Sequence, residues 1–311
     1  MRICFITVGD TARLTGGYLY HREVFARLRA GGATVAELVA SAADVPAQLA
    51  AAPGLGARVA PRRYDVLLVD ALARAAVAPW LDAWREERPL VAMVHELPGV
   101  ASGHQDADEL AWEAPLLRAD WLVVVSRHGA DILAGRGVPR ERIMVAPGGY
   151  DRLDEQAGLR PSRALPAGAR ALCVAQWISR KGIVELVRAW GRAAGPADVL
   201  ELVGEDHADP AYAREVWAAI AAAGARVIVR GAVGDAELEQ AYADADIFAM
   251  PTRYEGYGIA FAEALAHGLP VVGCAVGPLP ELVGSEAGLL VPPGDADALA
   301  EALAQLVGDP A

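Results

Sequence analysis

Short apolar runs alternate with segments of helical periodicity along the whole chain. Most of the runs are unbroken stretches of Val, Ile and Leu, which are typical of strands covered on both faces, as in parallel sheets. They are Ile3–Val8, Thr34–Val39, Asp65–Val69, Leu90–Val94, Trp121–Val125 and Ile143–Ala146, followed by Arg170–Ala175, Val199–Val203, Arg226–Val229, Asp246–Met250, Pro270–Cys274 and Gly288–Val291. The runs predict two successive sets of buried strands.

Helices are predicted between these runs, where apolar residues recur with the period of an α-helix. They include Tyr18–Ala30, Leu72–Trp84, Gly129–Ala134, Ile183–Ala193, Ala211–Ala223, Asp235–Ala243, Ile259–Ala266 and Ala296–Leu306. Strands that alternate with helices in this way predict an α/β fold with doubly wound parallel sheets.

A linker is predicted at residues 151–169, which contain prolines and glycines but no strong apolar period. We therefore expect two Rossmann-like domains, residues 1–155 and 156–311. Ligands of open α/β sheets bind beyond the carboxyl ends of the strands. Two such domains that face each other would enclose a cleft, and the functional residues would lie in the loops after the strands.

Composition and charge exclude several classes of function. The 311 residues are 54% hydrophobic, and 28 basic against 40 acidic side chains give a formal net charge of −12. No basic face typical of nucleic-acid binding is evident. No apolar run approaches the ~20 residues of a membrane helix, and the chain opens into a strand without the layout of a signal peptide. We expect a cytoplasmic protein without a transmembrane segment; peripheral membrane contact and the oligomeric state are left open.

The cysteines are Cys4, Cys173 and Cys274, and each lies in a predicted buried strand. An odd number without paired spacing predicts neither a disulfide framework nor a zinc site. We expect three buried thiols that pack as small hydrophobic side chains.

The strongest functional signal is the segment Pro251–Pro270, PTRYEGYGIAFAEALAHGLP. A predicted strand ends just before it, a glycine-rich turn with Glu255 follows, and a helix begins near Gly258. The unpaired amides of a first helical turn form an anion site, and glycines let a phosphate approach the backbone. Glu263 lies about two helical turns beyond Glu255 and can point into the same cleft. A carboxylate there suits a ribose diol, whereas Glu255 suits sugar hydroxyls.

Lys181 is the one lysine among the 28 basic residues. A chain that uses arginine wherever arginine suffices keeps lysine where a compact ammonium is needed. Lys181 also precedes the predicted helix Ile183–Ala193, where a cation opposes the helix dipole and needs another partner. It is therefore a candidate functional residue.

The segment Pro251–Pro270 resembles the signature of family 4 of the glycosyltransferases. In that signature two glutamates are separated by seven residues, and the first is followed by Gly-aromatic-Gly. The flanking stretches Ala245–Pro251 and His267–Val272 are similar to the family as well. The resemblance covers most of the chain and is most specific over Val227–Gly294. It implies the GT-B fold and transfer of a sugar with retention of its anomeric configuration.

The resemblance also implies roles for residues of the second domain. Glu255 would contact the transferred sugar, Glu263 would bind the ribose, and Lys181 would meet the donor phosphates. The diphosphate would be bound by the backbone amides of Gly256, Tyr257, Gly258 and Ile259. The family commonly has Gly-Arg where this chain has Ala175-Gln176, which removes one expected phosphate-binding arginine; Arg180 is the candidate to replace it.

In the first domain, the resemblance implies that Gly16 and Gly17 face the donor diphosphate and the acceptor. Such a glycine pair between a strand and a helix permits close approach of a ligand to the backbone. His95 follows a predicted strand, at a position where the family has a histidine beside the donor sugar. His104 lies in the predicted loop Gly99–Ala107 and is a candidate on the acceptor side.

Three Asp-x-Asp strings raise the question of a metal site: Asp106–Asp108, Asp244–Asp246 and Asp295–Asp297. The first is predicted in a polar loop, the second at the end of a helix, and the third at a helix N-cap. These placements favour structural roles, and we expect neither a bound metal nor a cofactor.

The sequence thus predicts a metal-independent, retaining hexosyltransferase that uses a UDP- or GDP-sugar, with Glu255, His95 and Lys181 as its catalytic residues. The helix N-terminus and Lys181 would stabilise the diphosphate leaving group. The base, the sugar and the acceptor are left open. The alternatives are another GT-B enzyme, namely a sugar-nucleotide epimerase or a phosphorylase, and a non-catalytic sugar-nucleotide binding module.

Overall fold

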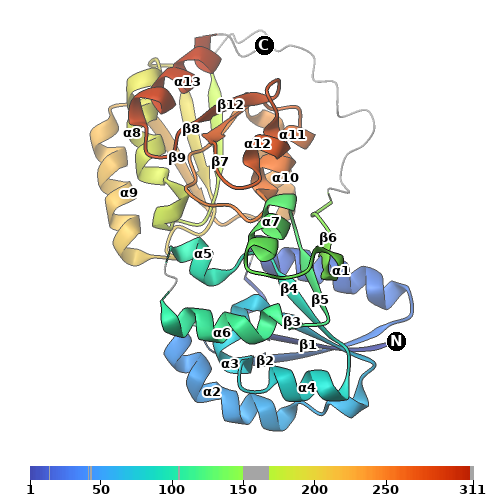
Figure 1. The fold of residues 1–311 in the computed structure, drawn as a ribbon. Coiled ribbons are helices and arrows are strands. Elements are labelled where there is room, and N and C mark those ends of the chain that lie inside the picture. Colours follow the sequence, from blue (N-terminus) through green and yellow to red (C-terminus); the bar gives the residue numbers. More distant parts are fainter. Residues whose placement is uncertain (14, 41, 43, 104–105, 150–167, 309–311) are drawn as a thin grey trace. The chain divides into compact units, whose positions relative to one another are not determined.

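The computed structural model describes residues 1–13, 15–40, 42, 44–103, 106–149 and 168–308 (Figure 1). The chain divides into two compact units, Met1–Gly148 and Gly149–Ala311. The domain boundary expected at residue 155 lies outside the described residues. Each unit contains a six-stranded sheet in which neighbouring strands run parallel, so the predicted α/β fold with doubly wound sheets is confirmed.

The sheet of the N-terminal unit has the strand order β2-β1-β3-β4-β5-β6. The strands are β1 (Arg2–Val8), β2 (Thr34–Ala40), β3 (Val66–Asp70), β4 (Leu90–Val94), β5 (Trp121–Val124) and β6 (Ile143–Val145). The helices are α1 (Gly16–Ala30), α2 (Val45–Arg58), α3 (Arg74–Val77), α4 (Leu81–Glu87), α5 (Pro98–Ser102), α6 (Ala107–Leu117) and α7 (Arg127–Gly135), with the 3-10 turns η1 (Pro61–Arg63), η2 (Ala71–Ala73) and η3 (Arg140–Arg142).

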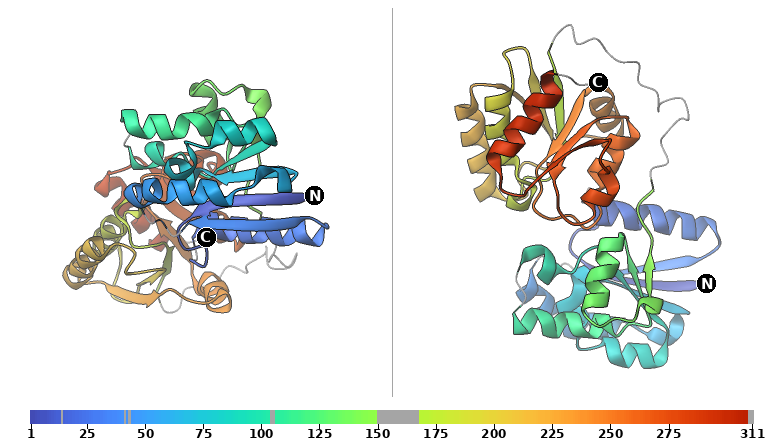
Figure 2. Two further views of the ribbon diagram at one scale, coloured as in Figure 1. Left: turned by 90° about the horizontal axis from the view of Figure 1, so that it is seen from below. Right: turned by 45° about the horizontal axis from the view of Figure 1, so that its top comes forward.

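Apolar side chains cover both faces of this sheet, which explains why its strands are unbroken apolar runs. On one face Phe25 of α1 packs with Phe5 and Met93. On the other face a larger cluster joins strand residues such as Leu67 to helix residues such as Leu55 of α2. Full burial of a side chain of this size contributes about 1.5–3 kcal/mol. The helices on the two faces are visible in Figure 2.

The sheet of the C-terminal unit has the order β12-β11-β10-β7-β8-β9, so the direction of winding changes beside β7. Its strands are β7 (Arg170–Val174), β8 (Val199–Val203), β9 (Arg226–Gly231), β10 (Ile247–Met250), β11 (Val271–Cys274) and β12 (Gly288–Val291). The helices are α8 (Ile183–Ala193), α9 (Pro210–Ala223), α10 (Asp235–Asp244), α11 (Ile259–Ala266), α12 (Leu279–Val283) and α13 (Ala296–Gly308), with the 3-10 turn η4 (Ser179–Lys181).

The winding of the C-terminal sheet places two loops side by side. Strand β7 pairs with β10 through Ala171 and Ile247, and it pairs with β8 on its other edge. Because β7 and β10 are parallel neighbours, the loops that follow them leave the sheet side by side at the carboxyl ends of the strands, at a topological switch point. Open α/β sheets bind their ligands at such points.

All of the predicted strands form, with bounds that differ by no more than two residues. The helix predicted over Leu72–Trp84 is wrong as a single element, because Pro79 separates α3 from α4. Proline lacks a backbone N–H and its ring clashes with the preceding helical turn. Helix α2 is an element that the apolar pattern does not predict, since it contains Pro53.

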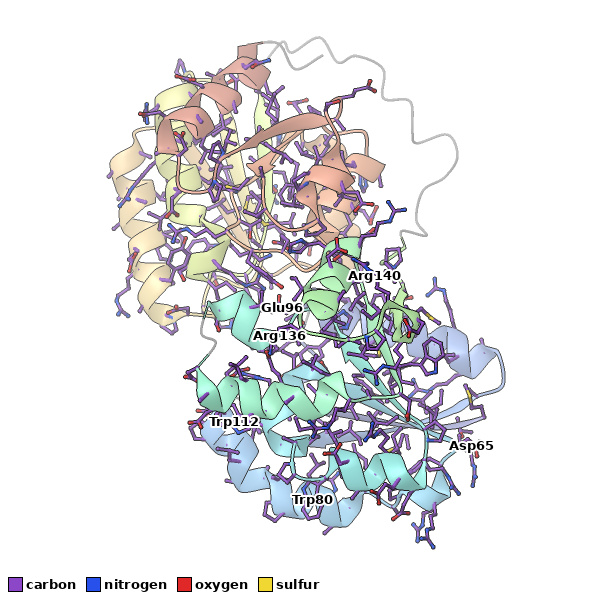
Figure 3. The ribbon with its side chains drawn as sticks, viewed as in Figure 1. Asp65, Trp80, Glu96, Trp112, Arg136 and Arg140 are labelled. Carbon is purple, nitrogen blue, oxygen red and sulfur yellow. The ribbon has the colours of Figure 1, made fainter. Side chains whose placement is uncertain are left out.

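The loop predicted over Gly99–Ala107 is also partly wrong, because α5 occupies much of it and α6 begins at Ala107. Glu113 of α6 is fully buried and holds the segment in place. One of its oxygens accepts a hydrogen bond from the backbone N–H of Gly99 at 3.0 Å, and the other lies 3.0 Å from Nη2 of Arg136. Figure 3 labels Arg136, which follows α7.

The three cysteines lie buried in β1, β7 and β11, as predicted, and none of them forms a disulfide. No helix in the described part of the chain has both the length and the apolar character needed to cross a membrane.

Candidate functional site

Lys181 and Glu255 meet at the switch point of the C-terminal sheet. Lys181 ends the 3-10 turn η4 after β7, and Glu255 lies in the loop after β10. Nζ of the lysine lies 2.5 Å from Oε1 of the glutamate. The side chains are only 15% and 9% exposed, so each charge needs the other for compensation. The sequence singled out both residues but did not predict their contact.

The two loops that carry this ion pair are joined by further hydrogen bonds. The backbone N–H of Arg253 donates to the carbonyl of Arg180 at 2.7 Å. Nη1 of Arg180 donates to the carbonyl of Tyr254 at 3.0 Å, and the hydroxyl of the fully buried Thr252 donates to the same carbonyl at 2.9 Å. Arg180, predicted to bind the donor, therefore serves in this structure to fasten one loop to the other.

Two glycines permit this arrangement of the backbone. Gly182 has φ +69°, and a Cβ there would lie 2.4 Å from the carbonyl oxygen of Pro251. Gly258 has φ +92°, and a Cβ there would lie 2.7 Å from a methyl group of Leu279. Both positions thus require glycine for conformation and for space.

Helix α11 begins at Ile259, with Gly258 as its N-cap residue, so the predicted helix start is confirmed. The first amides of an α-helix have no partner within the helix. Those of Ile259 and Ala260 therefore stand at the end of the loop that carries Glu255, in a position suited to an anion.

Glu263 lies one turn further along α11 and is held by a buried tyrosine. The hydroxyl of Tyr242, a residue of α10 that is 1% exposed, donates to Oε2 of Glu263 at 2.9 Å. The Tyr242 ring stacks on His267 with centroids 4.9 Å apart, and Nδ1 of His267 lies 2.8 Å from the carbonyl oxygen of Glu263. The sequence assigns neither residue a role: Tyr242 lies within a predicted helix, and His267 only begins a stretch that is similar to the family.

Gln176 stands where the family commonly has an arginine. Its Nε2 donates to Oε2 of Glu205 at 2.7 Å, so it links the loop after β7 to the loop after β8.

In the N-terminal unit, His95 leaves the end of β4 and meets His21 of α1. The two Nε2 atoms lie 2.8 Å apart. His21 is 4% exposed, and its ring packs against those of Phe5 and Phe25. The residue after His95, Glu96, is labelled in Figure 3 and belongs to the same loop. The sequence predicted a role for His95 but did not single out His21.

Both imidazoles are held in the neutral form. Burial lowers the pKa of His21 from 6.5 to about 4. Burial, assisted by repulsion from His21, lowers the pKa of His95 to about 4 against an opposing effect of Asp70. Asp70 is itself buried, which raises its pKa, and its carboxylate accepts a hydrogen bond from the Thr7 hydroxyl at 2.7 Å. The His21–His95 pair is therefore uncharged at neutral pH.

Gly16 and Gly17 are predicted in a turn before the helix, but α1 already begins at Gly16. The cause is Thr15, whose hydroxyl accepts from the backbone N–H of Tyr18 and caps the helix. A Cβ on Gly17 would lie 3.6 Å from the His95 ring, so this glycine and His95 are neighbours. His104 lies outside the described residues.

The Asp-x-Asp strings have structural roles. Asp106 is predicted in a polar loop, but it caps α6 by accepting from the Glu109 N–H at 2.9 Å. Asp246 accepts from the backbone N–H of Arg170 at 2.9 Å, and Asp295 caps α13 through the Ala298 N–H at 2.9 Å. Among the described residues, no cluster of three His, Cys, Asp or Glu side chains has the arrangement of metal ligands.

Two family models match the chain. The model described as Glycosyltransferase Family 4 matches residues 14–152, and that described as Glycosyl transferases group 1 matches residues 168–309. A D-inositol 3-phosphate glycosyltransferase of Kineococcus radiotolerans is 30% identical over 305 residues, which cover 86% of this chain and 70% of that protein.

An MMP α-(1→4)-mannosyltransferase of Mycolicibacterium hassiacum is 32% identical over 244 residues, or 71% of this chain. The matched part spans only 57% of the length of that enzyme.

Among solved structures, sucrose-phosphate synthase from Thermosynechococcus elongatus is similar with a TM-score of 0.79 and 25% identity, over 99% of this chain and 90% of that one. Anabaena HepE in complex with UDP and glucose is 19% identical with a TM-score of 0.74, over 98% and 90% of the two chains, and so shows the shared fold. The GT-B fold expected from the sequence is confirmed.

Proposed function

Given that the chain belongs to glycosyltransferase family 4, we propose that it moves a hexose-type sugar from a nucleotide-diphosphate sugar to an acceptor. We propose further that the transfer retains the anomeric configuration and needs no metal ion. The activities for which the relatives are named, a mannosyltransferase and an inositol-phosphate glycosyltransferase among them, are consistent with this class of reaction.

The observation that carries the proposal is the Lys181–Glu255 ion pair beside the first turn of α11. A buried ammonium and a buried carboxylate each cost free energy through loss of hydration, and attraction between them offsets that cost. Packing alone would be served as well by apolar side chains of similar volume. A charge pair at a switch point therefore favours a site for a charged ligand.

A donor diphosphate would exchange partners with this pair. Its negative charge would bind Nζ of Lys181 and the amides at the start of α11. Glu255 would then be released from Lys181 to accept hydrogen bonds from hydroxyls of the transferred sugar. Lys181 and Glu255 would thus each have a polar partner both before and after binding, because the diphosphate and the sugar hydroxyls take the places of the two members of the ion pair.

Glu263 would bind the ribose of the same donor. A carboxylate can accept hydrogen bonds from both hydroxyls of a diol. The Tyr242 hydroxyl orients the Glu263 carboxylate by donating a hydrogen bond to its Oε2 atom. This site would recognise the ribose regardless of the base, so the proposal covers UDP- and GDP-sugars alike.

In the proposed reaction the bond between C1 of the sugar and the diphosphate oxygen breaks, and a bond from C1 to the acceptor oxygen forms on the same face. The negative charge that develops on the leaving oxygen would be stabilised by Lys181 and the α11 amides, which are already oriented before the reaction. The acceptor proton would pass to the leaving phosphate. His95 would contribute a contact to the transferred sugar.

The first test is donor binding. A panel of UDP-, GDP- and ADP-sugars in the presence of EDTA is expected to give one donor that raises the melting temperature, because a ligand that binds only the folded state stabilises it. Glu263→Ala is expected to remove that shift. Absence of a shift for every donor, with the protein folded, would count against a donor site.

The second test is turnover with the donor so identified. Lys181→Met is expected to lower kcat/KM by about 100-fold or more, the loss typical of one preorganised transition-state donor. Arg192→Ala, which removes a cation of α8 paired with Asp297, is the matched control and should leave kcat/KM unchanged. If Lys181→Met destabilises the fold by leaving Glu255 unpaired, the neutral double variant Lys181→Met/Glu255→Gln is compared with Glu255→Gln alone, so that the loss of the Glu255 carboxylate is common to both and the difference reports Lys181.

The products separate this proposal from its alternatives. A transferase forms a glycoside only when an acceptor is present, and NMR of the anomeric proton reports whether the configuration is retained. An epimerase would convert the donor without an acceptor, and a phosphorylase would release sugar phosphate when given inorganic phosphate. A binding module would show the thermal shift without any product.

A further inference from the structure

The His21–His95 contact constrains which nitrogen of His95 can meet a ligand. The Nε2 atoms of the two rings lie 2.8 Å apart, so one must donate and the other accept. Both rings are neutral at neutral pH, each with a single N–H, because burial lowers both pKa values to about 4. The contact is therefore a hydrogen bond between two neutral rings, and Nδ1 is the only nitrogen of His95 not engaged in it.

His21 is held by packing and has one polar partner in the part of the chain that the structure describes. Its ring is parallel to that of Phe25, with an interplanar angle of 8°, and meets Phe5 edge to face at 4.6 Å. Nδ1 of His21 is buried and has no hydrogen-bond partner among the described residues. An apolar side chain would fill this position without leaving a polar atom unsatisfied. What histidine adds here is its Nε2, and that atom is directed to His95.

The unpartnered Nδ1 also indicates the direction of the hydrogen bond. If His95 donated, Nδ1 of His21 would carry a hydrogen that has no acceptor, and buried N–H groups without acceptors are especially rare in proteins. If His21 donates, its Nδ1 is only an unused lone pair. The second arrangement places the hydrogen of His95 on its Nδ1.

We propose that His21 is a positioning residue that fixes His95 as the neutral tautomer with hydrogen on Nδ1, so that His95 offers a hydrogen-bond donor, not a base, to an oxygen of the transferred sugar. The ligand part of this inference rests on the proposed function. The tautomer itself belongs to the ligand-free protein. Helix α1 thereby contributes the donor of this hydrogen bond, while Gly17 of its first turn lies against the same His95 ring.

The tautomer can be read directly from ligand-free protein. Long-range ¹H–¹⁵N correlation spectra of the histidine side chains, assigned with a His95→Gln variant, distinguish a protonated ring nitrogen from a bare one. We expect Nδ1 of His95 and Nε2 of His21 to be protonated near pH 7. A native spectrum with hydrogen on Nε2 of His95 would overturn the proposal without bearing on whether the protein is a transferase.

Variants of His21 then test whether the contact matters for transfer. His21→Leu preserves apolar packing but removes the donor, so the signal of His95 should lose its single tautomer and kcat/KM should fall about tenfold. The carboxamide of His21→Gln can still donate to Nε2 and should restore most of both. Phe25→Leu disturbs the same cluster without touching the hydrogen bond and should leave the tautomer unchanged. Equal kcat/KM for the Leu and Gln variants would refute the positioning role.

Discussion

Replacing His21 by leucine is expected to remove an acid-sensitive part of the stability of the N-terminal unit. In the native protein the buried ring of His21 is neutral because its pKa is lowered from 6.5 to about 4. Between these two pH values the unfolded chain binds a proton that the folded chain excludes. Stability from the neutral ring is thus fully present above pH 6.5 and is lost as the pH falls towards 4.

The magnitude follows from the same two pKa values. A difference of one pKa unit between the folded and unfolded states corresponds to about 1.4 kcal/mol. The lowered pKa of His21 therefore reduces the free energy of unfolding by up to about 3 kcal/mol in acid. Between pH 7 and pH 4.5 the native protein should lose about 2 kcal/mol through this residue. His95 has the same sign and remains in the variant, but there it no longer feels the repulsion from His21 that helps to lower its pKa, so the variant loses even less stability on acidification. Asp70, whose pKa burial raises, has the opposite sign and is common to both proteins, so comparison with His21→Leu cancels its effect.

The cysteines provide the assay. Cys4 is fully buried in β1 of the N-terminal unit, whereas Cys173 and Cys274 are buried in the C-terminal unit. Urea titrations at pH 7 and pH 4.5, read by the reaction of each thiol with a pyridyl disulfide, therefore report the free energy of unfolding of each unit. Cys173 and Cys274 serve as an internal reference.

We expect the free energy of unfolding at Cys4 to fall by about 2 kcal/mol more in the native protein than in His21→Leu. Equal losses in the two proteins would show that folded His21 accepts a proton without penalty, and the argument from its burial would then be refuted. A difference confined to Cys173 and Cys274 would equally contradict it.

Two further variants test contacts described above. Tyr242→Phe removes the hydroxyl that donates to Glu263, so steady-state kinetics should show a KM for the donor that is raised severalfold with little change in kcat. With a donor that lacks the ribose 2′-hydroxyl, the variant and the native protein should have the same KM, because the contact of Glu263 with the diol is already lost. Glu113→Gln should destabilise the N-terminal unit by about 3 kcal/mol, because it leaves Arg136 opposite a neutral amide in a buried pair. Asp131→Asn, which breaks an exposed pair, should change the urea midpoint little and is its control.

The strands could be predicted from the sequence because each is covered on both faces, and that environment selects continuous runs of Val, Ile and Leu. The helices were less predictable where proline interrupts them. Helix α2 continues through Pro53 because tertiary packing overrides local preference: Gly56 lies so close to Trp80 that a Cβ would be 2.2 Å from its ring, and the Trp80 N–H donates to the Ala52 carbonyl. A contact between residues that far apart in the chain leaves no periodic signal.

In the candidate site, too, the sequence indicated individual residues but not the contacts between them. Glu255, Glu263 and Lys181 were singled out as candidates from the glycine-rich turn before a helix, from the single lysine of the chain and from the resemblance to the family signature. Their partners could not be identified in this way, since pairing depends on which strands are neighbours, and β7 is separated from β10 by two intervening strands in the sequence. His21 was missed for a related reason, because a histidine within an amphipathic helix gives no indication of the strand end that it will meet.

The Lys181–Glu255 pair has a practical consequence, because Lys181 carries the one ε-amino group in the 311-residue sequence. Reductive methylation with ¹³C-formaldehyde would introduce a single side-chain resonance, apart from that of the terminal amine. Its chemical shift senses the charge and surroundings of the nitrogen, so it would follow the exchange of the carboxylate for a diphosphate during a titration. The composition of the chain thus provides a background-free spectroscopic reporter at the atom on which the proposed donor site depends.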